Sequence, residues 1–135
     1  MVHALKEIWR VLKPDGILID LRPIRLNVTI DLVHGDEMEL ISVYSDEWRV
    51  AKDKAADDAI TTVKSENLFT FQDSAPFEYV KYYDTGQEYI DYEAQRNPPI
   101  IHPDDVVQQV KVADDNPGVM IRLGTAMHLT SYRRS

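Results

Sequence analysis

Residues 4–23 read ALKEIWRVLKPDGILIDLRP, and this stretch carries the strongest structural signal in the chain. Residues 2–13 place apolar side chains every three or four positions, which is the pattern of an amphipathic helix. Pro14 and Gly16 end that helix, because proline cannot continue it and glycine supplies the free turn conformation. The nearly all-apolar run 17–21 follows, which is typical of a strand covered on both faces. Helix, tight turn and doubly buried strand are half of an α/β unit.

The remaining sequence alternates between strand and helix patterns without a linker between domains. The predicted elements, in chain order, are an antiparallel hairpin of residues 28–33 and 38–44, a helix over 46–66 with Ser45 as its N-cap, extended pieces over 68–83 broken at 74–76, a helix from 84 to about 96, a helix starting near Pro103, and a final strand over 119–132.

Composition excludes several classes of function. The chain has 135 residues, 44% of them hydrophobic, and a formal net charge of -8, so we expect a globular domain that does not bind nucleic acid. It has no cysteine, which rules out disulfides, thiolate metal sites and cysteine nucleophiles. No apolar run approaches the roughly 20 residues of a membrane span, and no signal-peptide pattern is present. We therefore expect no membrane association and a cytoplasmic protein.

The opening stretch resembles the class I S-adenosylmethionine-dependent methyltransferases, in particular the type 11-like group. In that family a segment of the form L-x-E-x-x-R-V-L-K-P-G-G-x-L is the helix and fifth strand of a seven-stranded sheet. The residues that fit are Leu5, Glu7, Arg10, Val11, Leu12, Lys13, Pro14 and Gly16, with Asp15 in place of the first glycine. The resemblance implies an α/β fold with a partial Rossmann-like sheet. With the hairpin read from residues 28–44, the expected order is helix–strand, hairpin, helix, strand, two helices and an antiparallel C-terminal strand.

The cofactor-binding elements of this family all precede the segment that opens this chain. They are a glycine-rich loop after the first strand, an acidic residue that ends the second, and a loop after the fourth. The five glycines here are isolated, and no G-x-G-x-x-G is present. We therefore expect residues 1–135 to be a single, truncated, methyltransferase-like C-terminal domain. S-adenosylmethionine is the family's cofactor, but we expect this chain alone to bind none.

Asp20 and Arg22 end the first predicted strand, where ligands bind in open α/β sheets. A carboxylate there could hold or deprotonate a methyl acceptor, and a guanidinium could clamp an acid group. The alternative is a structural Asp20–Arg22 pair, or Asp20 capping a neighbouring backbone group. Tyr82 and Tyr83 are further substrate-side candidates from a cluster of five tyrosines, whose alternative is core packing. No catalytic residue can be assigned.

The four histidines show no metal-ligand spacing, so we predict no metal site. His34 is best explained as a hairpin-turn residue. The acidic pairs Asp57-Asp58 and Asp114-Asp115 fit a solvated helix face and a polar turn better than a catalytic pair.

Two functional hypotheses follow. The first is methyl transfer from S-adenosylmethionine to an unknown small acceptor, which we expect only if an upstream cofactor-binding half completes the chain; the isolated chain should be inactive. The second is a non-catalytic interaction or dimerisation module derived from a methyltransferase. Without preceding strands, residues 17–21 would expose an unpaired edge and an apolar face. A homodimer or a complementary upstream fragment is therefore the expected partner.

Overall fold

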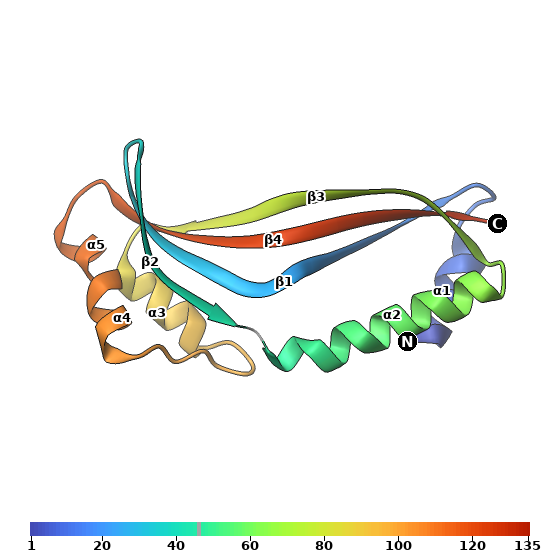
Figure 1. Ribbon diagram of the computed structural model, residues 1–135, viewed down its shortest axis with the longest axis horizontal. Helices are drawn as coiled ribbons and strands as arrows, with labels where there is room; N and C mark the ends of the chain where they lie inside the picture. The colour runs from blue at the N-terminus through green and yellow to red at the C-terminus, as the bar shows by residue number, and fades with distance from the viewer. Residues whose placement is uncertain (46) are drawn as a thin grey trace. The chain divides into compact units, whose positions relative to one another are not determined.

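The computed structural model describes residues 1–45 and 47–135, with the backbone alone at Arg25, Leu26 and Trp48. Its elements, in chain order, are α1 (Val2–Val11), β1 (Ile17–His34), β2 (Glu37–Ser45), the 3-10 turn η1 (Glu47–Arg49), α2 (Val50–Ser65), β3 (Phe69–Tyr83), α3 (Gly86–Ala94), α4 (Asp104–Val110), α5 (Val112–Asp115) and β4 (Val119–Arg134). Figure 1 labels the α-helices and the strands.

The strands form one antiparallel sheet in the order β2-β1-β4-β3, so the predicted α/β class is confirmed. The chain divides into two compact units. The first contains Met1–Leu26, Asp46–Phe77 and Ala126–Ser135, and the second contains Asn27–Ser45 and Glu78–Thr125. Three strands, β1, β3 and β4, contribute a part to each unit.

The core of the first unit lies between one face of the sheet and the helices α1 and α2. Val63, Phe69 and Tyr132 are buried there at 7% exposure or less. The predicted apolar face of α1 packs against them, together with Leu18 of β1. Each fully buried side chain of this size contributes about 1.5–3 kcal/mol of hydrophobic free energy, so this cluster is what holds α1 on the sheet.

The expectation that residues 17–21 are covered on both faces is wrong. Ile17, Ile19 and Leu21 are 46%, 51% and 51% exposed, whereas Leu18 packs into the core. Side chains of a strand alternate between the two faces of a sheet, and α1 and α2 pack on the face that carries Leu18. The three odd-numbered side chains therefore point to the other face, and their exposure agrees with the expected apolar surface.

The turn between α1 and β1 uses its residues differently from the prediction. Asp15, not Gly16, has the positive φ of 61°. Gly16 is needed for space, because a Cβ atom there would lie 2.8 Å from the Lys13 carbonyl oxygen. The backbone N–H of Gly16 donates to the same oxygen at 2.8 Å, which closes the turn.

The predicted hairpin is confirmed as β1 and β2, which pair antiparallel from Asn27 with Ser45 to His34 with Glu37. Gly35 has a φ of +60°, as a two-residue hairpin turn requires. Ser45 ends β2 and does not cap the next helix: α2 begins at Val50 and has no side-chain cap. The predicted helix start at residue 46 lies outside the described residues.

The predicted break at 74–76 is also wrong, because β3 runs without interruption from Phe69 to Tyr83. Pro76 lacks a backbone donor, but β3 is the last strand in the sheet order and has an edge where that donor is not required. The predicted helices after β3 are confirmed as α3 and α4. The Thr85 hydroxyl caps α3 by accepting from the Glu88 N–H at 3.0 Å.

The core of the second unit combines the hairpin with α3, α4, α5 and the first part of β4. Ile30, Tyr89, Val110 and Ile121 are fully buried there. Val106 and Val110 of α4 face this core as the sequence pattern predicts, while Val107 is only partly buried. No helix among the described residues has the length and apolar character needed to cross a bilayer.

Candidate functional site

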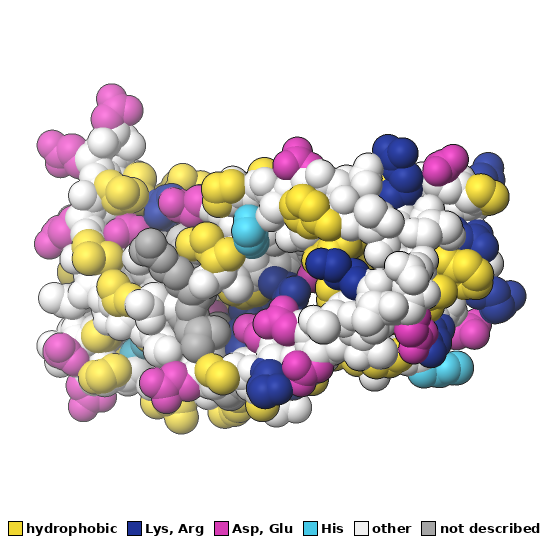
Figure 2. Space-filling view, turned by 45° about the vertical axis from the view of Figure 1, so that its right-hand side comes forward, with side chains coloured by type: hydrophobic (Ala, Val, Ile, Leu, Met, Phe, Trp, Pro, Cys, Tyr) yellow, Lys and Arg dark blue, Asp and Glu magenta, His cyan; other side chains and the backbone are white. Residues whose placement is uncertain are grey.

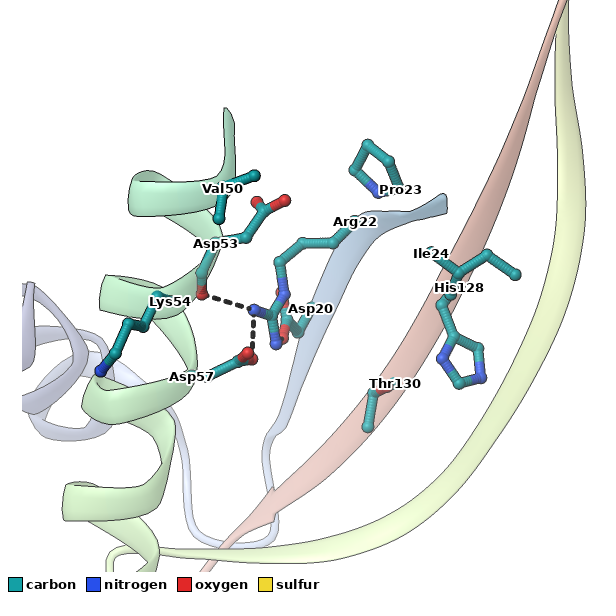
Figure 3. A pocket seen from close by; sticks show the side chains of 10 residues that line it. All are labelled: Asp20, Arg22, Pro23, Ile24, Val50, Asp53, Lys54, Asp57, His128 and Thr130. Atoms are coloured by element: carbon teal, nitrogen blue, oxygen red, sulfur yellow. Dashed lines mark hydrogen bonds and ion pairs between the residues drawn. The ribbon is translucent and has the colours of Figure 1, made fainter. Parts of the chain in front are cut away.

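A cavity of about 490 Å³ opens in the first unit between β1, the N-terminal half of α2 and β4. Figure 3 shows that β1 supplies Asp20, Arg22, Pro23 and Ile24 to its lining, α2 supplies Val50, Asp53, Lys54 and Asp57, and β4 supplies His128 and Thr130. Strand alternation brings Asp20 and Arg22 to this wall, because both lie on the Leu18 face that the helices cover. The cavity therefore contains the two site candidates predicted at the end of the first strand.

Arg22 is the centre of the charged network in this cavity. Its guanidinium donates to Asp20 Oδ2 at 2.7 Å and to Asp57 Oδ1 at 2.5 Å, and it reaches the backbone oxygen of Asp53 at 3.3 Å. Burial opposes the charge, but the hydrogen bonds that the guanidinium donates to Asp57 and Asp20 outweigh it and raise the pKa of Arg22 above its usual value. The arginine is thus held in place as a permanent cation between two carboxylates.

This geometry limits how Arg22 could take part in binding. Asp20 is only 18% exposed at its side chain, whereas Asp57 is 65% exposed. An incoming anion would have to displace Asp57, because that carboxylate holds the solvent side of the guanidinium. The structural Asp20–Arg22 ion pair, which was the alternative to a substrate role in the sequence analysis, is present. A substrate role for either residue stays a prediction.

β4, the strand next to β1 in the sheet, also lines the cavity, and its His128 contacts β3. The His128 Nε2 lies 2.7 Å from Ser74 Oγ, which is also 3.3 Å from Thr130 Oγ1. A serine hydroxyl next to an imidazole is the start of a nucleophile–base pair. No acidic side chain among the described residues is bonded to the other ring nitrogen, so the arrangement stops short of a triad.

Tyr82 and Tyr83 belong to the second unit, whereas Asp20 and Arg22 belong to the first. Tyr82 is 51% exposed. Tyr83 is 3% exposed and packs edge-on against Tyr89, with ring centroids 5.3 Å apart. Burial raises the pKa of Tyr83, so its hydroxyl stays protonated. Tyr83 is thus part of the core of the second unit, and the two tyrosines have different environments.

The second unit also contains a buried polar pair that the sequence did not indicate. His102 Nε2 and Tyr89 Oη lie 2.6 Å apart, and both residues are buried. Burial lowers the pKa of His102 and raises the pKa of Tyr89, so both groups stay neutral at pH 7. A neutral pair is satisfied when the Tyr89 hydroxyl donates to Nε2 and the ring proton sits on Nδ1.

Charged and aromatic side chains surround this pair. The Tyr44 ring packs edge-on against His102 at 5.2 Å, and its hydroxyl donates to Glu93 Oε2 at 3.4 Å. Glu93 is 2% exposed and accepts a hydrogen bond from Arg96 at 3.1 Å. Tyr44 is 58 positions from His102, so local sequence carries no signal for this cluster. Because the Glu93 carboxylate is buried, removing its partly exposed partner Arg96 would leave a buried charge uncompensated, which is costly.

No group of three or more histidine, aspartate or glutamate side chains in the described part of the chain could hold a metal ion. Comparisons with protein-family models, with curated proteins and with solved structures found no match for this chain.

Proposed function

We propose that this chain carries the fifth strand and the following elements of a class I methyltransferase-like fold. In this proposal it takes part in methyl transfer from S-adenosylmethionine to a small acceptor, together with a cofactor-binding segment that is not within these 135 residues. One observation carries the proposal: residues 4–23, which resemble that family in residue type, form a helix, a tight turn and a strand as α1 and the start of β1.

The elements after β1 support the same proposal. The resemblance implies a helix after strand five, then a strand, one or two helices and an antiparallel last strand. The chain follows this order with α2, β3, α3, α4 and β4, and adds the β1–β2 hairpin before α2. The proposal takes the parts of β1, β4 and β3 in the first unit as one end of a partial Rossmann-like sheet.

The division of roles follows from which residues are present. No glycine-rich loop occurs in the sequence, so the proposal assigns cofactor binding to the other segment. Asp20 is the proposed group that holds or deprotonates the acceptor, because it lines the cavity at the end of the strand. Arg22 positions that carboxylate at 2.7 Å. The rate advantage would come mainly from aligning donor and acceptor.

Titration calorimetry of the purified chain with S-adenosylmethionine tests the assignment of the cofactor site. We expect no saturable binding tighter than about 100 µM, which corresponds to roughly 5.5 kcal/mol. Tighter binding would mean that the chain contains a cofactor site of its own, against this proposal.

The second test asks for the cofactor-binding segment itself. The coding DNA immediately upstream should encode, in frame, a strand followed by a G-x-G-x-x-G loop. A polypeptide that includes this region should bind S-adenosylmethionine in the same calorimetric assay. If no such loop is encoded, or if the longer polypeptide does not bind the cofactor, the methyltransferase proposal is wrong.

The second candidate is a non-catalytic interaction module. It is favoured by the exposure of Ile17, Ile19 and Leu21, since large apolar side chains grouped on one strand are typical of interaction surfaces. This candidate requires no cofactor.

A further inference from the structure

The part of β1 in the first unit has one edge without a neighbouring strand. β4 lies on one side of β1, and pairing with β2 on the other side begins only at Asn27. In the described part of the chain, no strand pairs with that second side over residues 17–24. Unpaired backbone groups on such an edge can accept another strand.

The direction of the backbone groups defines which residues are available. The Gly16 carbonyl accepts from the Arg134 N–H at 2.8 Å, so the backbone of residue 16 faces β4. Backbone groups alternate sides along a strand, and those of Ile17, Ile19 and Leu21 therefore face the free edge. Pro23 would be the next residue on that edge, but proline has no N–H to donate, so it ends the pairing segment.

The same three residues carry the exposed apolar side chains. On the face drawn in Figure 2, apolar side chains lie among charged ones, and single exposed apolar residues are normal. Ile17, Ile19 and Leu21 stand at alternate positions of β1, so their exposed side chains form one row on one face of the strand.

We propose that residues 17–21 pair antiparallel with the same residues of a second copy of this chain, across a two-fold axis at Ile19. In this register Ile19 faces Ile19 of the second copy, and Ile17 faces Leu21. Every backbone N–H and C=O that the three residues direct to the free edge then has a partner. The outer side chains meet as apolar pairs on one continuous surface.

A second copy fits this edge because the segment is complementary to itself. The three residues whose backbone groups face the free edge are evenly spaced, and all three are apolar. A second copy that runs in the opposite direction therefore offers the same sequence of apolar residues and backbone groups. Moving the axis to residue 20 would set Asp20 opposite Asp20 of the second copy, which like charges disfavour. Moving it to Leu21 would pair Ile19 with Pro23, and a hydrogen bond would be lost at each end. This inference rests on the second candidate function, the interaction module.

Sedimentation equilibrium of the full chain over a wide concentration range is the first test. A five-residue strand pair is small for an interface, so we expect a monomer–dimer equilibrium with a dissociation constant of about 10–100 µM. A species that stays monomeric at about 1 mM would overturn the proposal. Binding of S-adenosylmethionine is measured separately, so failure of the dimer and failure of the methyltransferase proposal appear in different measurements.

Charge substitutions test the register. Ile19→Glu and Ile19→Lys should each weaken dimerisation at least about tenfold, because each places like charges opposite one another at the axis. An equimolar mixture of the two variants should recover dimers, since the opposite charges then meet. If the mixture behaves like the separate variants, Ile19 does not face itself and the proposed pairing is wrong. Ile101→Glu, at a position 84% exposed in the second unit, is the control and should leave the dissociation constant unchanged.

Ile19→Pro separates strand pairing from simple apolar contact. The variant keeps an apolar side chain at position 19 but removes the backbone N–H that faces the free edge, because proline has no N–H. We expect the dimer to weaken about tenfold or more, with the circular-dichroism spectrum and melting temperature of the monomer retained. A dimer as strong as that of the unmodified chain would show that the backbone edge is not used.

Discussion

The Tyr89–His102 pair offers the most direct test of how the second unit is stabilised. Replacing Tyr89 with phenylalanine removes one hydroxyl oxygen and leaves the ring, which is fully buried, in its place. The lost atom is the partner of His102 Nε2 at 2.6 Å. The variant thus isolates one hydrogen bond without opening a large cavity.

The magnitude follows from burial. A hydrogen bond exposed to water would cost little to remove, because water replaces the partner. Here His102 is only 9% exposed, so the Tyr89→Phe variant leaves its Nε2 without a partner in a low-dielectric core. A buried polar atom left unsatisfied costs about 1–3 kcal/mol, and we expect Tyr89→Phe to lower the free energy of unfolding by about 2 kcal/mol.

Urea unfolding monitored by far-ultraviolet circular dichroism measures this change. For an m-value of about 2 kcal/mol/M, the transition midpoint of the second unit should fall by about 1 M. Tyr79→Phe is the matched control, since Tyr79 is 54% exposed in the same unit, and its midpoint should change by less than about 0.25 M. Equal midpoints for the two variants would refute the reasoning that the buried hydrogen bond matters.

Three further predictions concern pH, the cavity arginine and the glycines. Burial lowers the pKa of His102 in the folded chain, so on acidification the unfolded chain takes up a proton at this residue at a higher pH than the folded chain does. The contribution of His102 to the free energy of unfolding is therefore complete above about pH 6.5 and is lost as the pH falls toward the lowered pKa. The urea midpoint should be lower at about pH 5 than at about pH 7.5, and His102→Gln should reduce this difference. Arg22→Gln should lower the free energy of unfolding, measured with urea, by about 1–2 kcal/mol, because the mostly buried carboxylate of Asp20 loses its ion pair. Lys6→Gln is the control and should cost under about 0.5 kcal/mol, because the Lys6–Glu66 ion pair is exposed. Gly86→Ala should lower the free energy of unfolding, measured by urea unfolding, by at least about 3 kcal/mol, because the new Cβ would clash with the backbone oxygen of Val110. Gly35→Ala should cost about 1 kcal/mol, because its position is open but has a positive φ.

Most elements were predictable because their signals are local. Apolar spacing and the Pro14–Gly16 turn located α1 and the start of β1, and the turn residues at His34–Glu37 located the hairpin. The wrong prediction of a break in β3 arose because a local pattern does not show where a strand lies in the sheet. Pro76 suggested a break in β3, but a proline is tolerated at a free sheet edge, and the position of a strand in the sheet is not a local property.

The candidate site was predictable only in part. Asp20 and Arg22 are two positions apart on one strand, so alternation alone brings their side chains to one face. Their third partner, Asp57, comes from α2, and nothing near Arg22 in the sequence indicates it. The Tyr89–His102 pair depends likewise on how α3 and the segment before α4 pack against one another.

Spacing and composition were sufficient to predict the order and type of most elements, the absence of cysteine chemistry and of a glycine-rich loop, and the mostly apolar character of residues 17–21. These are properties of spacing and composition, which act over a few residues. The packing of the helices on one face of β1, which leaves Ile17, Ile19 and Leu21 exposed, could be seen only in the folded chain. The same is true of Arg22, which is held between two carboxylates. Burial and charge pairing depend on which distant segments meet, and the local pattern of a single strand contains no information about that.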